Sequence, residues 1–275
     1  MIRDLIYDHA GLHFEDDAAV LFERRLNDRL QALGLPSYGA YYKYLRFNVH
    51  GEAEVEEAVE RLTTKETYFF RQEYQLRAFQ EELLPRLVAM TRHQRRMHIW
   101  SAGCATGEEA YTIAILVQES GLFRDDEVRV IGSDISRNAI ARARGGVYRS
   151  TSFRATPPEL YAKYFREGVE GVEVIESVRE MCHFGQLNLL DQSRVPLIGR
   201  VDVIFCRNVL IYFDMNSRRK VIDAFYDRLL PGGYLLLGHS ESLLNVTTAF
   251  ELVHLSEDLV YRKPTIPERA SGGPR

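Results

Sequence analysis

Two adjacent carboxylates follow a glycine turn at the end of a short apolar run. Residues 99–102 have the composition of a buried strand, Gly103 and Gly107 bracket a turn, and Glu108 and Glu109 open an apolar helical pattern. Glycine at position 103 allows a positive φ and close approach of a ligand, and doubly wound α/β proteins bind nucleotides at such a turn. Carboxylates there would repel the phosphate that helix N-termini normally bind. The turn therefore suits a cationic nucleoside ligand without phosphate.

A third acid supports a nucleoside site. Asp134 ends the apolar run 128–133, and an acid at the tip of the second strand accepts hydrogen bonds from ribose hydroxyls in nucleotide-binding α/β folds. S-Adenosylmethionine (SAM) fits both observations, because it joins an adenosine without phosphates to a sulfonium and an ammonium group. The alternative is that Asp134 or Ser136 only caps the helix that begins near Arg137.

Two further segments contain residues that could complete this site. Residues 63–71 (TTKETYFFR) combine hydroxyls, aromatics and an arginine, which suits either a lid over an apolar pocket or a packed linker. A loop with Asn208 and Tyr212 follows the apolar strand at 201–206, where open α/β sheets bind their ligands. Asn208 offers a donor and an acceptor, and Tyr212 offers a π face for a sulfonium. The alternative for Tyr212 is a packed aromatic below the sheet.

The elements that must position these residues alternate strand and helix. This alternation predicts a parallel sheet with right-handed crossovers, with strands at 97–102, 127–133, 201–206 and 234–238 and helices at 107–120, 136–144 and 216–230. Within 147–186 we expect a short helix at 157–165 and a small antiparallel hairpin from alternating apolar positions between 172 and 184. A closing hairpin is expected at 250–254 and 258–262. The fold class is therefore α/β, a doubly wound sheet with an inserted antiparallel β-subdomain.

The first 90 residues predict an all-helical domain. Apolar spacing indicates helices at 17–33, 38–45, 52–62 and 73–90, with Ser37 as an N-cap. A basic linker follows to residue 96, and the α/β domain spans 97–263 with its β-subdomain at 147–186. The tail at 264–275 is polar and rich in Pro and Gly, so we expect it to be disordered.

Composition limits the classes of function. The 275 residues carry a net charge of −4, which argues against a nucleic-acid or anionic-membrane surface. The eight histidines have no paired metal spacing, so no metal site is expected. The three cysteines are best explained as buried reduced thiols. Because the sequence has no signal peptide and no apolar run of membrane-spanning length, we expect a cytoplasmic protein without membrane insertion.

Together these segments resemble the chemotaxis receptor methyltransferases (CheR family). The matched segments keep the order of that family and are TTKETYFFR (63–71), IWSAGCATGEEAYTIAI (99–115), GSDIS (132–136), NLL (188–190), VDVIFCRNVLIYF (201–213) and PGGYLLLGHSESL (231–243). The resemblance implies methyl transfer from SAM, leaving S-adenosylhomocysteine (SAH). The acceptors it implies are glutamate side chains on the cytoplasmic helices of chemoreceptors.

The resemblance also implies a set of site residues. Arg71 and Tyr212 would lie nearest the transferred methyl group as catalytic residues. Glu108 would hold the methionine ammonium, Asp134 the ribose, and Asn188 with Leu189 the adenine. With the glycine turn and the 63–71 segment included, the expected cofactor-binding residues are Lys65, Thr67, Arg71, Gly103, Glu108, Asp134, Asn188, Leu189, Asn208 and Val209.

Lys65 departs from the family, which usually has asparagine at this position. A lysine adds a positive charge near a sulfonium unless it points to solvent or pairs with Glu66. This residue favours one alternative function, a SAM-binding signalling module without turnover; the other is a methyltransferase with a different substrate. The short turn at 167–171 lacks the glycine-rich extension of peptide-binding members. We therefore expect the β-subdomain to dock a receptor weakly at most.

Overall fold

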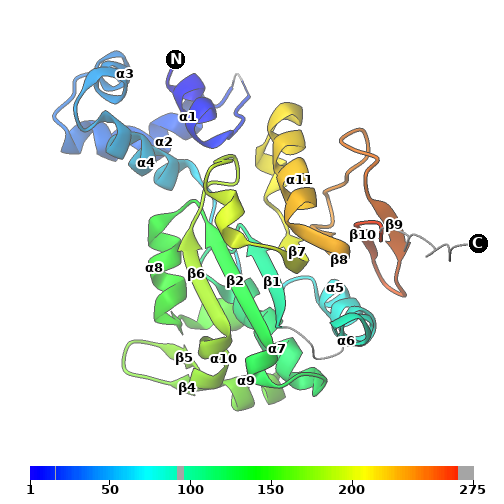
Figure 1. Cartoon of the computed structure of the whole chain (residues 1–275). Coiled ribbons are helices and arrows are strands. Elements are labelled where there is room, and N and C mark those ends of the chain that lie inside the picture. The colour runs from blue at the N-terminus through cyan, green and yellow to red at the C-terminus, as the bar shows by residue number, and fades with distance from the viewer. Residues whose placement is uncertain (16, 92–95, 266–275) are drawn as a thin grey trace, which may run out of the picture.

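A mixed seven-stranded sheet lies at the centre of the described residues, which are 1–15, 17–91 and 96–265 of this computed structural model (Figure 1). Its strand order is β6-β2-β1-β7-β8-β10-β9. The strands are β1 (Met97–Ala102), β2 (Val128–Asp134), β6 (Cys182–Gln186), β7 (Val201–Cys206), β8 (Leu229–Leu237), β9 (Glu251–His254) and β10 (Leu259–Arg262). Strand β10 runs antiparallel to both β8 and β9, so the predicted closing hairpin is confirmed.

The strand order creates a switch point beside β1. Strand β1 pairs in parallel with β2 on one side and with β7 on the other, and Ile99 is opposite both Val130 and Val203. Helices cover both faces of these strands, which explains why every residue of β7 is buried rather than every second one. In open α/β sheets, ligands bind outside the carboxyl ends of strands at such a point.

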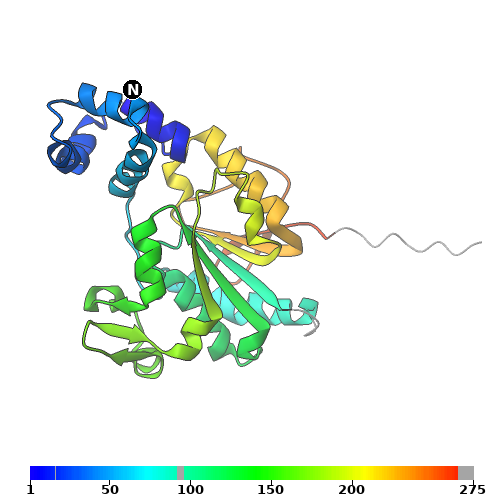
Figure 2. The same ribbon diagram turned by 60° about the vertical axis from the view of Figure 1, so that its left-hand side comes forward.

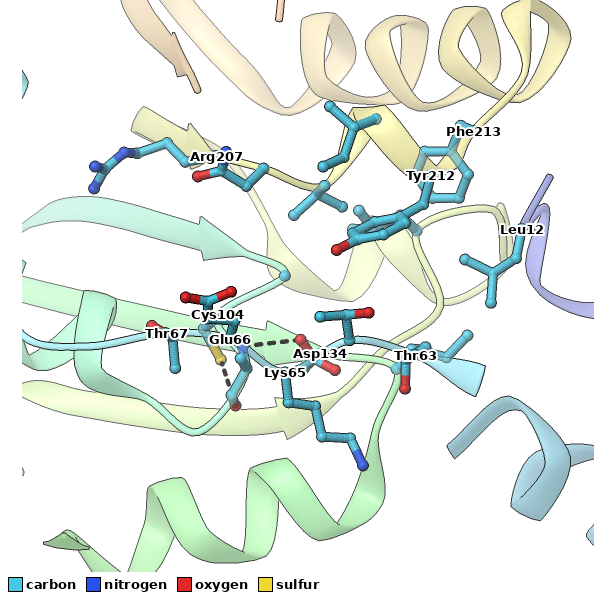
Figure 3. A pocket seen from close by; sticks show the side chains of 18 of the residues that line it. Leu12, Thr63, Lys65, Glu66, Thr67, Cys104, Asp134, Arg207, Tyr212 and Phe213 are labelled. Carbon is cyan, nitrogen blue, oxygen red and sulfur yellow. Dashed lines mark hydrogen bonds between the residues drawn. The ribbon is translucent and has the colours of Figure 1, made fainter. Parts of the chain in front are cut away.

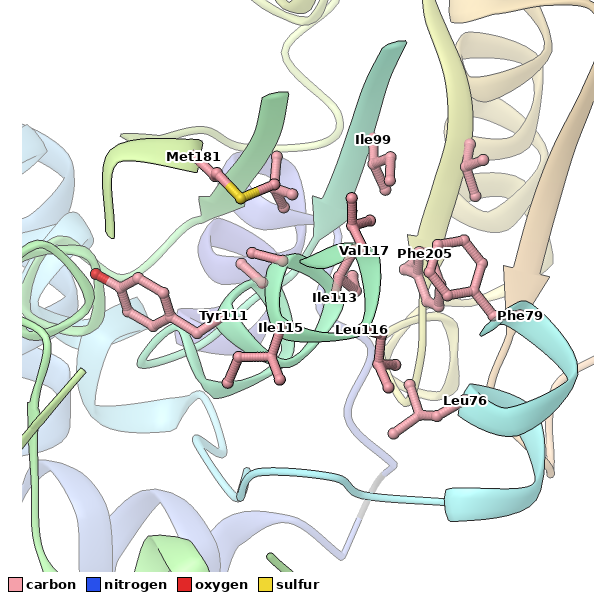
Figure 4. Packing of buried hydrophobic residues seen from close by; sticks show 14 of the residues in the cluster. Leu76, Phe79, Ile99, Tyr111, Ile113, Ile115, Leu116, Val117, Met181 and Phe205 are labelled. Atoms are coloured by element: carbon pink, nitrogen blue, oxygen red, sulfur yellow. The ribbon is translucent and has the colours of Figure 1, made fainter. Parts of the chain in front are cut away.

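One face of the sheet is covered by helices from three parts of the chain. These are α5 (Glu73–Ala78), the π-helical η1 (Phe79–Leu83), α6 (Leu84–Thr91), α7 (Glu108–Ser120) and α10 (Glu176–Met181). The Phe79 and Phe205 rings meet edge to face at 5.0 Å (Figure 4). The helix predicted at 73–90 is confirmed with a π-helical turn before Pro85, which has no N–H to donate. Its packing groups it with the sheet rather than with the preceding helices.

The other face is covered by α11 (Met215–Arg228), and the N-terminal helices α1 (Ile2–Ala10), α2 (Ala19–Ala32), α3 (Tyr38–Phe47) and α4 (Gly51–Leu62) join the same hydrophobic cluster from one end of the molecule (Figure 2). The indole of Trp100 packs on Phe225 with ring centroids 5.1 Å apart, and its N–H donates to Ser133 Oγ at 2.9 Å. Ser37 caps α3 as predicted, since its Oγ accepts from the N–H of Ala40. Figure 2 shows the N-terminal helices gathered at one end of the molecule. Helix α1 was not predicted.

The segment between α8 (Arg137–Gly145) and β6 corrects the predicted hairpin. In the described chain it forms a three-stranded antiparallel sheet in the order β3-β5-β4, from β3 (Val147–Tyr148), β4 (Phe165–Glu167) and β5 (Val172–Val174), with α9 (Pro158–Tyr164) as predicted. Val178 lies in α10, and β6 pairs in parallel with β2. The hairpin is therefore wrong beyond Val174, because alternating apolar residues do not indicate which sheet a strand joins.

The thiols are buried as their apolar context predicts. Cys104, Cys182 and Cys206 are free of disulfides, and burial raises the pKa of each thiol.

Within 1–15, 17–91 and 96–265, none of the helices has both the length and the apolarity needed to cross a bilayer. The central part of the predicted linker, 92–95, and the predicted tail from residue 266 lie outside the described residues.

Candidate active site

A cavity of about 520 Å³ opens at the carboxyl ends of β1, β2 and β7 (Figure 3). This volume is in the usual range of small-molecule sites. The walls come from residues within the segments 10–14, 62–71, 103–105, 134–135, 187–189 and 207–213, among others. All the site residues expected from the sequence line this cavity except Glu108. The structure therefore brings together residues from segments far apart in sequence, and their contacts with a cofactor remain predictions.

Backbone hydrogen bonds hold the turn after β1 against the end of β2. The N–H groups of Gly103 and Cys104 both donate to the Ser133 carbonyl, at 2.8 and 2.9 Å. Gly103 has a φ of 79°, and a Cβ there would lie 2.4 Å from Val209 Cγ2. Gly107 allows a close approach to helix α8, since a Cβ would lie 2.8 Å from the Cβ of Ala143.

Glu108 and Glu109 occupy different environments, which corrects the expected ammonium site. The Glu108 carboxylate is buried, accepts hydrogen bonds from Thr106 Oγ1 at 2.6 Å and Ser152 Oγ at 3.0 Å, and does not line the cavity. Glu109 lines it instead and is paired with Arg207 at 3.3 Å. Burial raises the pKa of both carboxyls. Adjacent helical residues point about 100° apart, so only one of the two acids can face the ligand.

Asp134 connects two of the turns that form the cavity. Its Oδ2 accepts from the N–H of Ala105 at 2.9 Å (Figure 3), and its Oδ1 accepts from the N–H of Ser136 at 2.8 Å. Burial raises the pKa of Asp134. The cap of α8 is Ser136, whose Oγ accepts from the N–H of Ala139. Asp134 is therefore not the helix cap, and a carboxylate has lone pairs left for ligand hydroxyls.

Lys65 is compensated by an acid that the sequence did not indicate. Its ammonium pairs with the Glu60 carboxylate and also donates to the Glu60 carbonyl at 3.1 Å. Although burial raises the pKa of Glu60, hydrogen bonds from Lys65 and Ser136 lower it overall. In Figure 3 the Lys65 side chain points away from Tyr212. Glu66, which the sequence offered as one of two ways to relieve this charge, pairs instead with Arg154 at 3.1 Å.

Arg71 and Tyr212 line the same cavity from different segments. Arg71 Nη1 donates to the Glu66 carbonyl at 2.9 Å, which fixes one end of the guanidinium. Tyr212 ends the 3₁₀ turn η5 (Leu210–Tyr212), and its carbonyl accepts from the N–H of His13 at 2.8 Å. The next residue, Phe213, forms an antiparallel bridge with Leu12. Tyr212 is thus a wall residue of the cavity, not a packed aromatic below the sheet.

Asn188 is partly occupied by contacts within the protein. Its Nδ2 donates to the His9 carbonyl at 2.6 Å, and its Oδ1 accepts from the N–H of Leu190 at 3.0 Å. The amide group therefore holds the N-terminal segment against the cavity. Adenine contacts at this position would come from the backbone and from Leu189.

Arg207 is a cavity residue that the sequence reasoning missed. Its side chain is buried at the end of β7, where it pairs with Glu109 and donates to Gln72 Oε1 at 2.8 Å and to the Arg71 carbonyl. Burial lowers its pKa, but an arginine remains charged at neutral pH. A charged residue directly after an apolar strand was the available signal. Arg207 thereby supports both Glu109 and the backbone of Arg71.

The polar groups of the cavity fit SAM. Asp134 supplies acceptors for hydroxyls, and Glu109 supplies a negative charge for an ammonium. The Oδ1 atom of Asn208, which also lines the cavity, is buried without a hydrogen-bond partner in the part of the chain that the structure describes. A buried acceptor without a partner is costly, so a donor from a ligand would satisfy it.

Comparison with known proteins identifies the family. Residues 1–63 match the model "CheR methyltransferase, all-alpha domain", and residues 65–259 match "CheR methyltransferase, SAM binding domain". Chemotaxis protein methyltransferase 2 of Vibrio cholerae serotype O1 is 36% identical over 266 residues, covering 95% of this chain and 91% of the relative. The chemotaxis protein methyltransferase of Salmonella typhimurium is 35% identical over 260 residues, covering 91% and 85%. A solved structure of the N-methyltransferase NodS from Bradyrhizobium japonicum with SAH aligns at a TM-score of 0.40 and 18% identity, covering 68% of this chain and 87% of NodS. This chain belongs to the CheR family of methyltransferases and contains the SAM-binding domain of that family.

Proposed function

We propose that this chain transfers methyl groups from SAM to glutamate side chains on the cytoplasmic helices of chemoreceptors, forming carboxyl methyl esters in chemotaxis adaptation. Membership of the CheR family supports this reaction class. The observation that carries the proposal is that Glu109, Asp134 and Arg71 all line the same cavity. A receptor substrate of this kind places the protein in the cytoplasm.

The cavity offers a separate partner for each part of the cofactor. Asp134 would accept hydrogen bonds from the ribose, and Glu109 would bind the ammonium group. Leu189 would contact the adenine, and the unpartnered Oδ1 of Asn208 would accept a donor from the bound molecule. When bound, SAM supplies an electrophilic methyl group on a sulfonium.

Esterification of a glutamate needs alignment more than proton transfer. The acceptor carboxylate has an ordinary pKa of about 4.3, so at neutral pH it is already a nucleophile without a general base. Arg71 would bind one carboxylate oxygen and leave the other directed at the methyl group, and the Glu66 carbonyl keeps that guanidinium in place. Such positioning contributes about 7–11 kcal/mol in well-aligned reactions. Because charge is neutralised during transfer, exclusion of water by the apolar wall also favours it.

In the structure, Lys65 gives little support to the alternative function, a SAM-binding sensor without turnover. Lys65 was the reason to consider it, and its charge is compensated by Glu60.

The β-subdomain would contribute weak receptor docking, for which the exposed Val169 between β4 and β5 is a candidate contact. A calorimetric titration with a peptide from a receptor C-terminus tests this docking, and tight binding would contradict it.

A transfer assay tests the proposed function. The purified protein is incubated with SAM radiolabelled on its methyl group and with membranes that contain chemoreceptors. Label on the receptor that alkali releases as methanol identifies a carboxyl ester. Label that resists alkali would identify another acceptor chemistry, and absence of transfer by a protein that binds SAH would favour the sensor.

A further inference from the structure

The half-buried carboxylate of Glu241 receives a cluster of backbone hydrogen bonds. Its Oε2 accepts from the N–H groups of Asn208 at 2.8 Å and Gly238 at 2.7 Å. Its Oε1 accepts from the N–H groups of Val209 at 2.9 Å and Ile211 at 3.2 Å. Glu241 follows β8, whereas three of these donors belong to the loop after β7. One side chain thus fixes the backbone of the loop that forms a wall of the cavity.

The local geometry explains why this loop needs such a carboxylate. Asn208 has a φ of 60°, a left-handed conformation that non-glycine residues adopt only at a cost of ~1–3 kcal/mol when the surroundings hold them there. The turn leaves neighbouring N–H groups without carbonyl partners in a sheet or helix, and two carboxylate oxygens can accept all of them. Gly238 makes room for this contact, since a Cβ there would lie 2.7 Å from Glu241 Oε2 and 2.8 Å from the Asn208 nitrogen.

The loop conformation decides what the cavity presents to a ligand. It directs Val209 against Gly103, keeps Asn208 in the cavity wall with an unpartnered Oδ1, and leads directly to Tyr212. We propose that Glu241 is a positioning residue for methyl transfer, which holds the 208–212 loop in the shape that binds the cofactor and presents Tyr212 to the reacting groups. Only the effect of Glu241 on methyl transfer rests on the proposed function; its effect on the loop and on cofactor binding does not.

Glu241→Gln tests the proposal with little change in size. Glutamine replaces one acceptor oxygen with a donor, which then faces two backbone N–H groups. We expect faster amide hydrogen exchange at 208–211 in the ligand-free protein, and a rise of roughly tenfold or more in the Kd for SAH measured by calorimetry. In the receptor assay, kcat should fall more than KM for the receptor changes, because the loop acts on the reacting groups.

Two further variants separate positioning from general stability. Gly238→Ala keeps every charge but displaces the carboxylate, so it should reproduce the exchange and affinity changes even if Glu241→Gln fails to fold. Glu251→Gln is the matched control, because Glu251 pairs with Arg262 on the exposed β9–β10 hairpin. It should leave exchange in the loop and SAH affinity unchanged.

The outcomes distinguish this proposal from the proposed function. Unchanged loop exchange and unchanged SAH affinity in folded Glu241→Gln would overturn the role of Glu241, as would an equal effect of Glu251→Gln. Hydrogen exchange and SAH titration require no methyl acceptor. If they behave as expected while the wild-type protein methylates no receptor, only the proposed function fails.

Discussion

Replacing Glu109 by glutamine tests which of the two adjacent acids binds the amino group of the cofactor. Glu109 lines the cavity, and the buried Arg207 beside it keeps Gln72 Oε1 and the Arg71 carbonyl as partners after the change. A hydrogen bond to a charged group is worth about 1.5–3 kcal/mol net, and each 1.4 kcal/mol is tenfold in Kd. Glu109→Gln should therefore raise the Kd for SAH about 10- to 100-fold.

Calorimetric titration with SAH is the appropriate assay. SAH keeps the ammonium and the ribose but lacks the sulfonium, so its affinity reports the amino-group contact without the methyl group. Glu108→Gln is the matched control, because it makes the same chemical change one residue away, where the carboxylate contacts Thr106 and Ser152. Its Kd should change by less than about threefold, close to the ~0.5 kcal/mol scatter of uncoupled changes.

The result that would refute this reasoning is an effect of Glu108→Gln equal to or larger than that of Glu109→Gln. Thermal unfolding of both variants is needed beside the titration, because Glu109→Gln also removes an ion pair from a buried arginine. A loss of affinity counts only for protein that still unfolds cooperatively.

Three other predictions concern single residues of the site. Arg71→Ala should lower kcat about 100-fold or more by removing carboxylate orientation, with little change in the Kd for SAH. The control is Arg77→Ala, at a surface arginine paired with Glu73 and Glu257. Equal losses of binding and turnover in Arg71→Ala would contradict the orienting role. Gly103→Ala should destabilise the protein by about 1–3 kcal/mol in urea unfolding and weaken SAH binding, and Val209→Ala in the same chain should recover part of both, since Val209 Cγ2 lies 2.4 Å from the added Cβ. Glu108→Gln should be more stable than the wild-type protein at neutral pH, because burial raises the pKa of Glu108 and its charge therefore opposes folding. That advantage should shrink as the pH falls through the raised pKa and disappear below the ordinary value near 4.5, as thermal unfolding across this range will show.

Sequence patterns predicted the framework of the site because the framework is local. The strand at 97–102, the turn at Gly103 and the acid at Asp134 each follow from a few neighbouring residues, and the structure places them at one cavity. The alternation of strands and helices also predicted the parallel pairing of β1 with β2 and β7.

The parts that sequence reasoning missed depend on contacts across long stretches of chain. Glu241 binds backbone groups about 30 residues earlier, and Arg207 contacts Gln72 and Glu109. Lys65 finds its partner in helix α4 rather than in the adjacent Glu66. The choice between Glu108 and Glu109 depends on the rotation of helix α7 relative to the sheet, which their identical chemistry does not reveal.

The N-terminal segment has a thermodynamic consequence for cofactor binding. Ala10, Leu12, His13 and Phe14 line the cavity, the N–H of His13 donates to the Tyr212 carbonyl, and Leu12 bridges to Phe213. Docking of this segment against the cavity and binding of the cofactor are therefore thermodynamically linked: each makes the free energy of the other more favourable by the same amount. A macromolecule that pulls on helix α1 or α2 would therefore change how long spent SAH stays bound.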